Sequence, residues 1–147
     1  MKSIILAILT ISIASTSYFS LGFNFNKVED RLIAEDYETI YCAEDDMDGI
    51  AGISVSVSLS ILGIEEDATE AILASFGEEY FYAFEFADKR TANDAYSQLE
   101  DNYDDLKSKN DLNYCTYGKK GNVVYFGTVD AVKDALGRPA SLFVREK

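Results

Sequence analysis

The amino-acid sequence predicts an α+β domain, in which an antiparallel or mixed sheet of about five strands carries helices on one face. In residues 79–106, an aromatic run with a period of two breaks at Asp88 into apolar residues spaced three and four apart, as in a strand followed by a helix. Residues 53–61 alternate strictly between apolar residues and serine. A chain of 147 residues with 48% hydrophobic side chains also has enough apolar material for one core and one domain.

Residues 1–26 are predicted to be a signal peptide or an N-terminal membrane anchor that precedes the domain. Lys2 is followed by an apolar run and then by small residues, and no further charge occurs before Lys27. The run is long enough to cross a bilayer, and no good cleavage site closes it, so both forms stay open. A buried helix of a soluble protein is the alternative. The first two cases make the protein extracytoplasmic, either secreted or held in the membrane by this hydrophobic helix.

The first half of the domain is predicted to open with a helix at residues 27–34 and a strand at residues 37–43. After an acidic turn, residues 53–61 have apolar side chains at the odd positions and serines between them, which predicts a strand with one wet face. Residues 65–76 are predicted to form a short helix, because acidic residues occur early and Gly77 follows its end.

The second half continues from the aromatic strand and its helix into a hairpin and a last helix. Residues 113–117 and 122–126 are predicted to pair across a four-residue turn with glycine at both ends. Thr128 is the candidate N-cap of the final helix, and Gly137 is its predicted end.

The predicted domain therefore covers residues 27–138, and residues 139–147 form a C-terminal tail. Its order is helix, strand, strand, helix, strand, helix, strand, strand, helix. Cys42 and Cys115 each follow a tyrosine on comparable strands, which indicates either a distant internal repeat or chance. The two cysteines are an even pair in a chain predicted to be exported, so a disulfide between them is predicted. Two unpaired core thiols are the alternative.

Composition narrows the classes of function. The net charge is −13, which argues against nucleic-acid binding, since phosphates require a basic surface. It also argues against adsorption to an anionic membrane, so membrane contact is expected only through the N-terminal segment. The chain has no histidine, which excludes imidazole-based triads, and it contains no phosphate loop or dinucleotide fingerprint. No cofactor is predicted.

The densest acidic segment offers a candidate metal site. Glu44, Asp46 and Asp48, followed by Gly49, resemble the opening of an EF-hand calcium loop, in which alternate carboxylates converge on the ion. The resemblance covers six residues, and the twelfth loop position falls on Val55 where a bidentate glutamate is required. A solvated turn between two strands would use the same residues.

Glu85 is a second candidate for chemistry, because it lies between Phe84 and Phe86 in the aromatic strand. If its face of the sheet is covered, its pKa is expected to rise and it would need a partner such as Lys89 or Arg90. The simpler interpretation is an outward-facing residue on a sheet covered on one side.

The sequence thus favours a non-catalytic, exported or membrane-anchored module that binds an unknown protein or small ligand. The serines between residues 54 and 60 could contact such a ligand, but the favoured interpretation is structural: small hydroxyl residues let a helix pack closely or leave the face wet. A weak calcium-binding protein that uses the acidic segment is one alternative. A carboxylate-based hydrolase is another.

Overall fold

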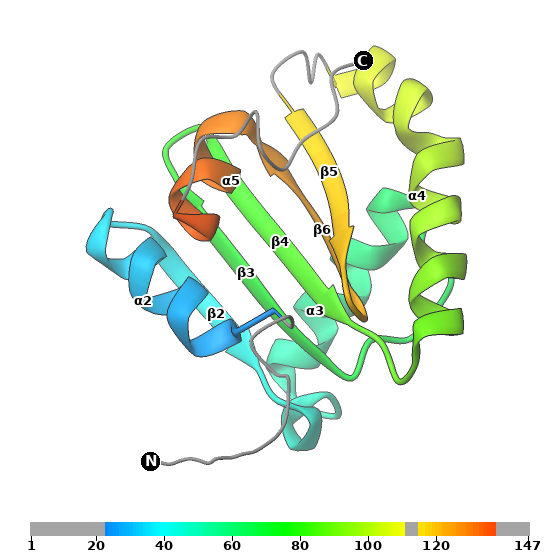
Figure 1. The fold of residues 1–147 in the computed structure, drawn as a ribbon, viewed down its shortest axis with the longest axis horizontal. Coiled ribbons are helices and arrows are strands. Elements are labelled where there is room, and N and C mark those ends of the chain that lie inside the picture. Colours follow the sequence, from blue (N-terminus) through cyan, green and yellow to red (C-terminus); the bar gives the residue numbers. More distant parts are fainter. Residues whose placement is uncertain (1–22, 111–114, 138–147) are drawn as a thin grey trace.

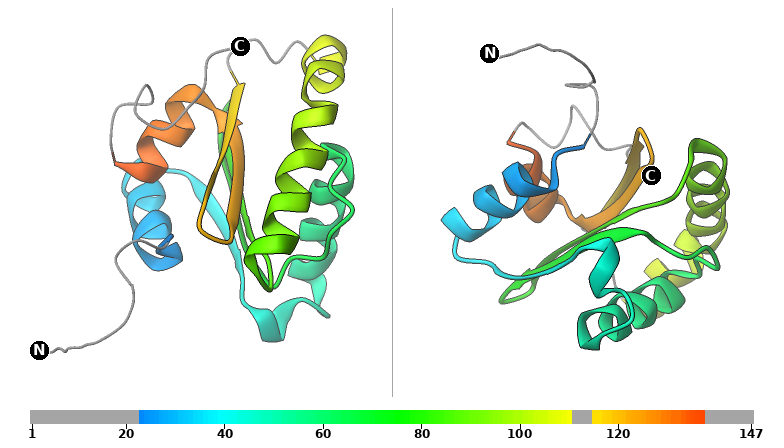
Figure 2. Two further views of the ribbon diagram at one scale, coloured as in Figure 1. Left: turned by 45° about the vertical axis from the view of Figure 1, so that its right-hand side comes forward. Right: turned by 90° about the horizontal axis from the view of Figure 1, so that it is seen from below.

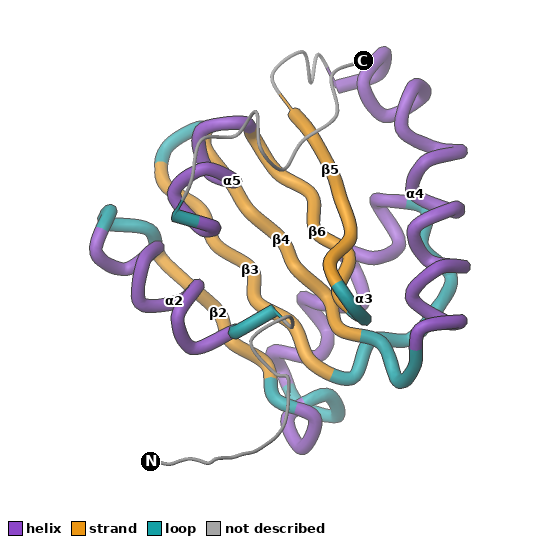
Figure 3. Tube along the Cα trace, in the orientation of Figure 1, coloured by secondary structure: helices purple, strands orange, loops and turns teal. Residues whose placement is uncertain are grey.

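The computed structural model describes residues 23–110 and 115–137 (Figure 1). Five antiparallel strands form one sheet in the order β2-β3-β4-β6-β5, as Figure 3 shows in orange. The strands are β2 (Glu38–Cys42), β3 (Glu70–Phe76), β4 (Glu79–Glu85), β5 (Cys115–Lys120) and β6 (Val123–Thr128). The helices in these residues are α2 (Phe25–Ala34), the 3-10 turn η3 (Glu44–Asp46), α3 (Ile50–Leu62), α4 (Lys89–Asn110) and α5 (Val129–Leu136). The α+β class and the five-stranded antiparallel sheet are therefore confirmed.

Helices cover both faces of this sheet, so the prediction of helices on one face is wrong. Figure 2 shows the sheet between a layer of α2 and α5 and a layer of α3 and α4. The strands carry apolar side chains on both sides, because Phe81 of β4 packs in the core under α2 and α5, while Phe84 packs in the core under α3 and α4. A strand that is apolar on both faces requires a helix layer on each.

Two elements have the other type of secondary structure: a predicted strand is a helix, and a predicted helix is largely a strand. Residues 53–61 belong to helix α3, and residues 70–76 of the predicted helix form strand β3. In β3 the four consecutive residues Ala71, Ile72, Leu73 and Ala74 are buried, because both faces of the strand are covered. Such a continuous apolar run has no period of two, and it therefore resembles a buried helix in the sequence.

The other predicted elements are confirmed, with local corrections. Helix α4 begins after Asp88, whose carboxylate accepts a hydrogen bond from the backbone N–H of Thr91 at 2.8 Å. The hairpin turn is shorter than predicted, since β5 continues to Lys120 and only Gly121 and Asn122 connect it to β6. Gly137 ends α5 in the left-handed conformation, with φ of 69°.

The predicted leader and tail lie largely or wholly outside the described part of the chain. Residues 1–22 and 138–147 are not described, and neither are residues 111–114 before β5. Within the described ranges, no helix has both the length and the apolar character needed to cross a membrane.

Candidate functional site

Helix α3 has no charged residue in its thirteen positions, and it is apolar on two opposite sides. Ile50, Ile53, Val57 and Ile61 are 86%, 64%, 53% and 60% exposed. At 3.6 residues per turn they lie within roughly a quarter of the helix circumference, and we call these four residues the α3 stripe. A run of exposed aliphatic side chains on one helix differs from scattered surface residues and is typical of an interaction surface.

The opposite side of α3 fixes the stripe in its outward position. Val55, Leu59 and Leu62 are buried in the core that α3 and α4 form against the sheet. Gly52 faces the same side, where a Cβ atom would overlap the backbone carbonyl of Met47. The helix cannot rotate about its axis to bury the stripe without exposing these residues, and each buried aliphatic side chain contributes about 1.5–3 kcal/mol.

The four serines of α3 border the stripe on both sides. Their helical spacing places Ser56 and Ser60 along one border and Ser54 and Ser58 along the other. The Ser58 hydroxyl donates to the backbone carbonyl of Ser54 at 2.9 Å. The serine row that the sequence predicts on a single wet face is therefore divided between two flanks of a helix.

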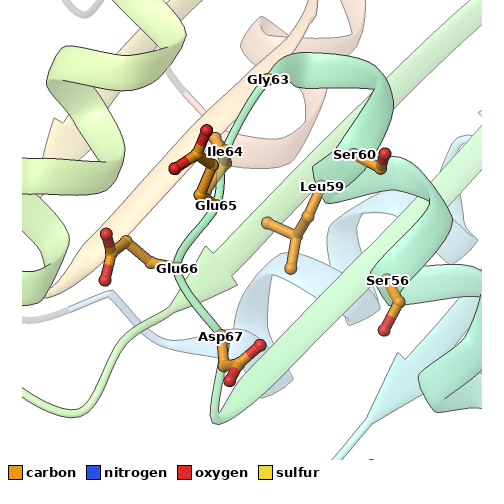
Figure 4. Close-up of a pocket in the computed structure, with 8 residues that line it drawn as sticks. All are labelled: Ser56, Leu59, Ser60, Gly63, Ile64, Glu65, Glu66 and Asp67. Carbon is orange, nitrogen blue, oxygen red and sulfur yellow. The ribbon is translucent and has the colours of Figure 1, made fainter.

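An open groove lies beside α3 on the Ser56 and Ser60 border (Figure 4). It has a volume of about 370 Å³, and the loop from Gly63 to Asp67 forms its other wall. The nearly buried side chain of Leu59 supplies apolar surface inside the groove, and Glu65, Glu66 and Asp67 line its margin. The Asp67 carboxylate lies on the α3 side of the loop, whereas the Glu66 carboxylate points away from α3.

A second groove, of about 310 Å³, lies on the other flank of α3. It combines Ser58 with the apolar side chains of Ile40, Leu73 and Tyr82 and with several polar residues of β2 and β3. Ile40 belongs to the edge strand β2 and is 45% exposed. The α3 stripe therefore lies between two grooves that each contain some apolar surface.

Acidic residues lie at both ends of α3. Glu44, Asp45, Asp46 and Asp48 precede the helix and are exposed, and the segment 65–67 follows it. No lysine or arginine occurs between Arg31 and Lys89. The loop after α3 is attached to α4, because Gln98 accepts a hydrogen bond from the Glu65 backbone N–H at 2.7 Å and donates one to the Glu66 carboxylate at 2.9 Å. The backbone of Glu65 and the carboxylate of Glu66 are thus held in place.

The predicted calcium ligands lie in the first of these acidic segments. Glu44 and Asp46 belong to η3, Asp48 follows it, and all three side chains are exposed. Over residues 23–110 and 115–137, no group of three or more acidic or cysteine side chains is arranged to hold a metal ion. Calcium binding here stays a prediction that gains no support from the geometry.

Cys42 and Cys115 are free, buried thiols, so the structure does not form the predicted disulfide. They lie on β2 and β5, the two edge strands, with three strands between them. Four strand spacings amount to about 19 Å. A disulfide requires Cα atoms within about 7 Å. Desolvation raises the pKa of both thiols, and the nearby charge of Asp46 adds to the effect at Cys42.

Glu85 lies opposite Glu70 in the register of β4 and β3. Desolvation by partial burial, the hydrogen bond to Glu70 and the charge of Glu70 raise the pKa of Glu85 to about 7. The Tyr41 hydroxyl donates to Glu70, and this bond and burial raise the pKa of Tyr41 to about 12. The expected rise is therefore present, but its partner is a second carboxyl group instead of Lys89 or Arg90.

The exchange of helix and strand between residues 53–61 and 70–76 explains why the sequence did not predict this pair or the α3 stripe. Glu70 fell inside a predicted helix, so nothing in the sequence placed it opposite Glu85. Ile53, Val57 and Ile61 were assigned to the buried side of a strand. The one signal in the sequence that could have indicated the α3 stripe is the uncharged segment 49–64, which lies between two acidic clusters.

No protein-family model, curated protein or solved structure matches this chain. The surface of α3 is therefore the basis for a functional proposal.

Proposed function

We propose that this protein is a non-catalytic, extracytoplasmic binding module that docks a partner protein through the α3 stripe. In this proposal it is secreted or anchored by residues 1–26. The observation that carries the proposal is the exposure of four aliphatic side chains along one side of an uncharged helix. Covering an isoleucine or valine side chain is worth about 1.5–3 kcal/mol, so the stripe can supply a large part of a binding free energy.

The shape of the surface supports a protein partner over a small ligand. Small-molecule sites are typically concave and bury most of the ligand. The stripe instead runs along about 17 Å of helix, which is the form of surface that receives another helix or an extended chain. The two grooves widen this surface on either flank.

The state of the titratable side chains supports a non-catalytic role. A reactive cysteine requires a lowered pKa and solvent access. Cys42 and Cys115 are buried, and burial raises the pKa of each. The Glu70 and Glu85 pair lies on the face of the sheet opposite α3, so it belongs to a different part of the molecule from the proposed docking surface.

Reaction with a membrane-impermeant maleimide in intact host cells tests both parts of the proposal. Val57→Cys places a thiol on the stripe, and Ile33→Cys places a matched thiol on α2, where Ile33 is equally exposed at 53%. The native thiols are buried and give little background. We expect both variants to react at similar rates when purified, and we expect only the Ile33→Cys variant to keep that rate in intact cells.

Two results would contradict the proposal in different ways. Equal reaction of both variants in intact cells would mean that nothing covers the stripe. Reaction of the Ile33→Cys variant only after lysis would mean that the domain is not extracytoplasmic.

A further inference from the structure

Resting on the proposed function, we propose that the partner segment is an amphipathic helix with lysine or arginine at both ends of an apolar face. Its two cationic ends would be about 20 Å apart, because the thirteen residues of α3 separate the two acidic segments by that length. The apolar face would lie along the α3 stripe, in the way that amphipathic helices occupy apolar grooves.

Charge around α3 selects a cationic partner. The exposed side chains of Glu44, Asp45, Asp46 and Asp48 lie at the start of the helix, and the residues 65–67 lie at its end. The whole segment between Arg31 and Lys89 supplies no positive charge. Complementary charge across an interface raises the association rate and fixes the register of the two partners.

The acidic segment after α3 has no role in stabilising the helix. The C-terminal end of a helix carries partial negative charge, so nearby carboxylates are unfavourable there. Glu65, Glu66 and Asp67 nevertheless follow two to four residues after the C-cap Gly63, and Gln98 holds their loop against α4. A cation from a partner would offset this local repulsion.

The groove in Figure 4 has the form required by a long cationic side chain. Leu59 offers apolar surface for the aliphatic stem of a lysine or arginine. The Asp67 carboxylate lies on the α3 side of the loop, where it can meet the charged group. The serines on the border of α3 are small, so they allow the partner backbone to approach the helix closely.

Two other occupants fit the same surface less well. A second copy of this chain would bring acidic ends against acidic ends, whether the two α3 helices pack parallel or antiparallel. The apolar run of residues 4–22 has no basic residue of its own, and Lys2 gives it a cation at one end alone.

The inference is tested by binding of designed helical peptides to the full chain, measured by fluorescence anisotropy. All peptides share one leucine and alanine face, and their ends carry two lysines, two glutamines or two glutamates. We expect the lysine-ended peptide to bind at least about tenfold more tightly than the glutamine-ended peptide at low salt, with the ratio falling as salt is added.

Matched variants test whether the preference for the lysine-ended peptide comes from the acidic residues at the ends of α3. Asp45→Asn with Glu65→Gln removes one charge at each end of α3, and we expect it to weaken binding of the lysine-ended peptide severalfold. Asp30→Asn with Glu35→Gln makes the same change in net charge on the opposite face of the sheet, and it should leave the affinity nearly unchanged. Both pairs of side chains are exposed, so folding is not at risk.

The outcomes separate this inference from the proposed function. Equal binding of all three peptides would overturn the cationic partner and leave apolar docking intact. Binding of none would overturn the inference, while the maleimide experiment would still decide the proposed function. A dimer in sedimentation equilibrium that Val57→Ser dissolves would show a second copy as the occupant. Peptide binding that occurs only in the Ile8→Asp variant would show that the chain's own N-terminal run occupies the α3 stripe. Either the dimer result or this result would overturn the inference.

Discussion

Glu85 at the end of β4 and Glu70 at the start of β3 face each other across the sheet, and each side chain is partly buried. A carboxyl group beside a second carboxyl group holds its proton more tightly than it does in water. Desolvation is the largest cause that raises the pKa of Glu85 from its ordinary value of 4.5 to about 7, and the hydrogen bond and charge of Glu70 add to it. Tyr41 fixes the arrangement by donating to Glu70.

Glu85 makes the stability of the fold depend on pH in a defined direction. A folded-state pKa above the unfolded value means that the folded chain binds the proton more tightly, so the stabilisation is present below pH 4.5 and is lost as the pH rises to about 7. We expect Glu85 to lower the free energy of unfolding by on the order of 1 kcal/mol between pH 5 and pH 8, after allowance for its partial exposure. Urea denaturation at the two pH values measures this difference.

Glu85→Gln should remove most of this dependence and raise the free energy of unfolding at pH 8. Glu78→Gln is the control, because Glu78 is exposed in the turn between β3 and β4 and loses the same charge. If both variants keep the wild-type pH dependence, the paired carboxyl groups do not titrate as described.

At the scale of the element, α3 shows how one pattern fits two structures. Apolar residues at every odd position from 53 to 61 satisfy a period of two, but on a helix the same residues separate into two groups. Val55 and Leu59 then point to the core, and Ile53, Val57 and Ile61 point to solvent. A helix with one apolar side can be recognised in the sequence by the 3.6-residue period of its apolar residues. Helix α3 has two apolar sides, so this period is obscured.

This difference predicts unequal costs for truncating neighbouring odd positions. Leu59→Ala should lower the free energy of unfolding by about 2–5 kcal/mol, because it opens a cavity in the core. Val57→Ala should change it by less than about 0.5 kcal/mol, because the side chain is exposed. Chemical denaturation of the two variants measures both values, and comparable losses would mean that residues 53–61 share one buried face after all.

At the scale of the whole molecule, the sequence was sufficient for the class of fold but not for its layers. The amphipathic helix α4 and the hairpin of β5 and β6 carry local signals in their spacing and glycines, so they were predictable. The second helix layer depends on which strand faces are covered, and β3 shows that a strand covered on both faces loses the alternation that would identify it.

The α3 stripe was less predictable, because its exposure also depends on tertiary packing. Whether the apolar residues of α3 lie inside or outside is decided by the packing of Val55, Leu59 and Leu62 against α4 and the sheet. The separation of Cys42 from Cys115 is likewise a consequence of strand order, since the chain passes from β4 through α4 to the far edge before it returns as β6. Strand order is not encoded in any single segment.

The most direct test of the docking surface is a methyl NMR titration of the full chain with the lysine-ended peptide. We expect the largest shifts at the methyl groups of the α3 stripe, and we expect small shifts at Val55 and Leu62, which face the core. Ile33 of α2 serves as an exposed methyl group on the opposite face of the sheet. Binding that shifts Ile33 most, with the α3 stripe unchanged, would contradict the assignment of docking to α3.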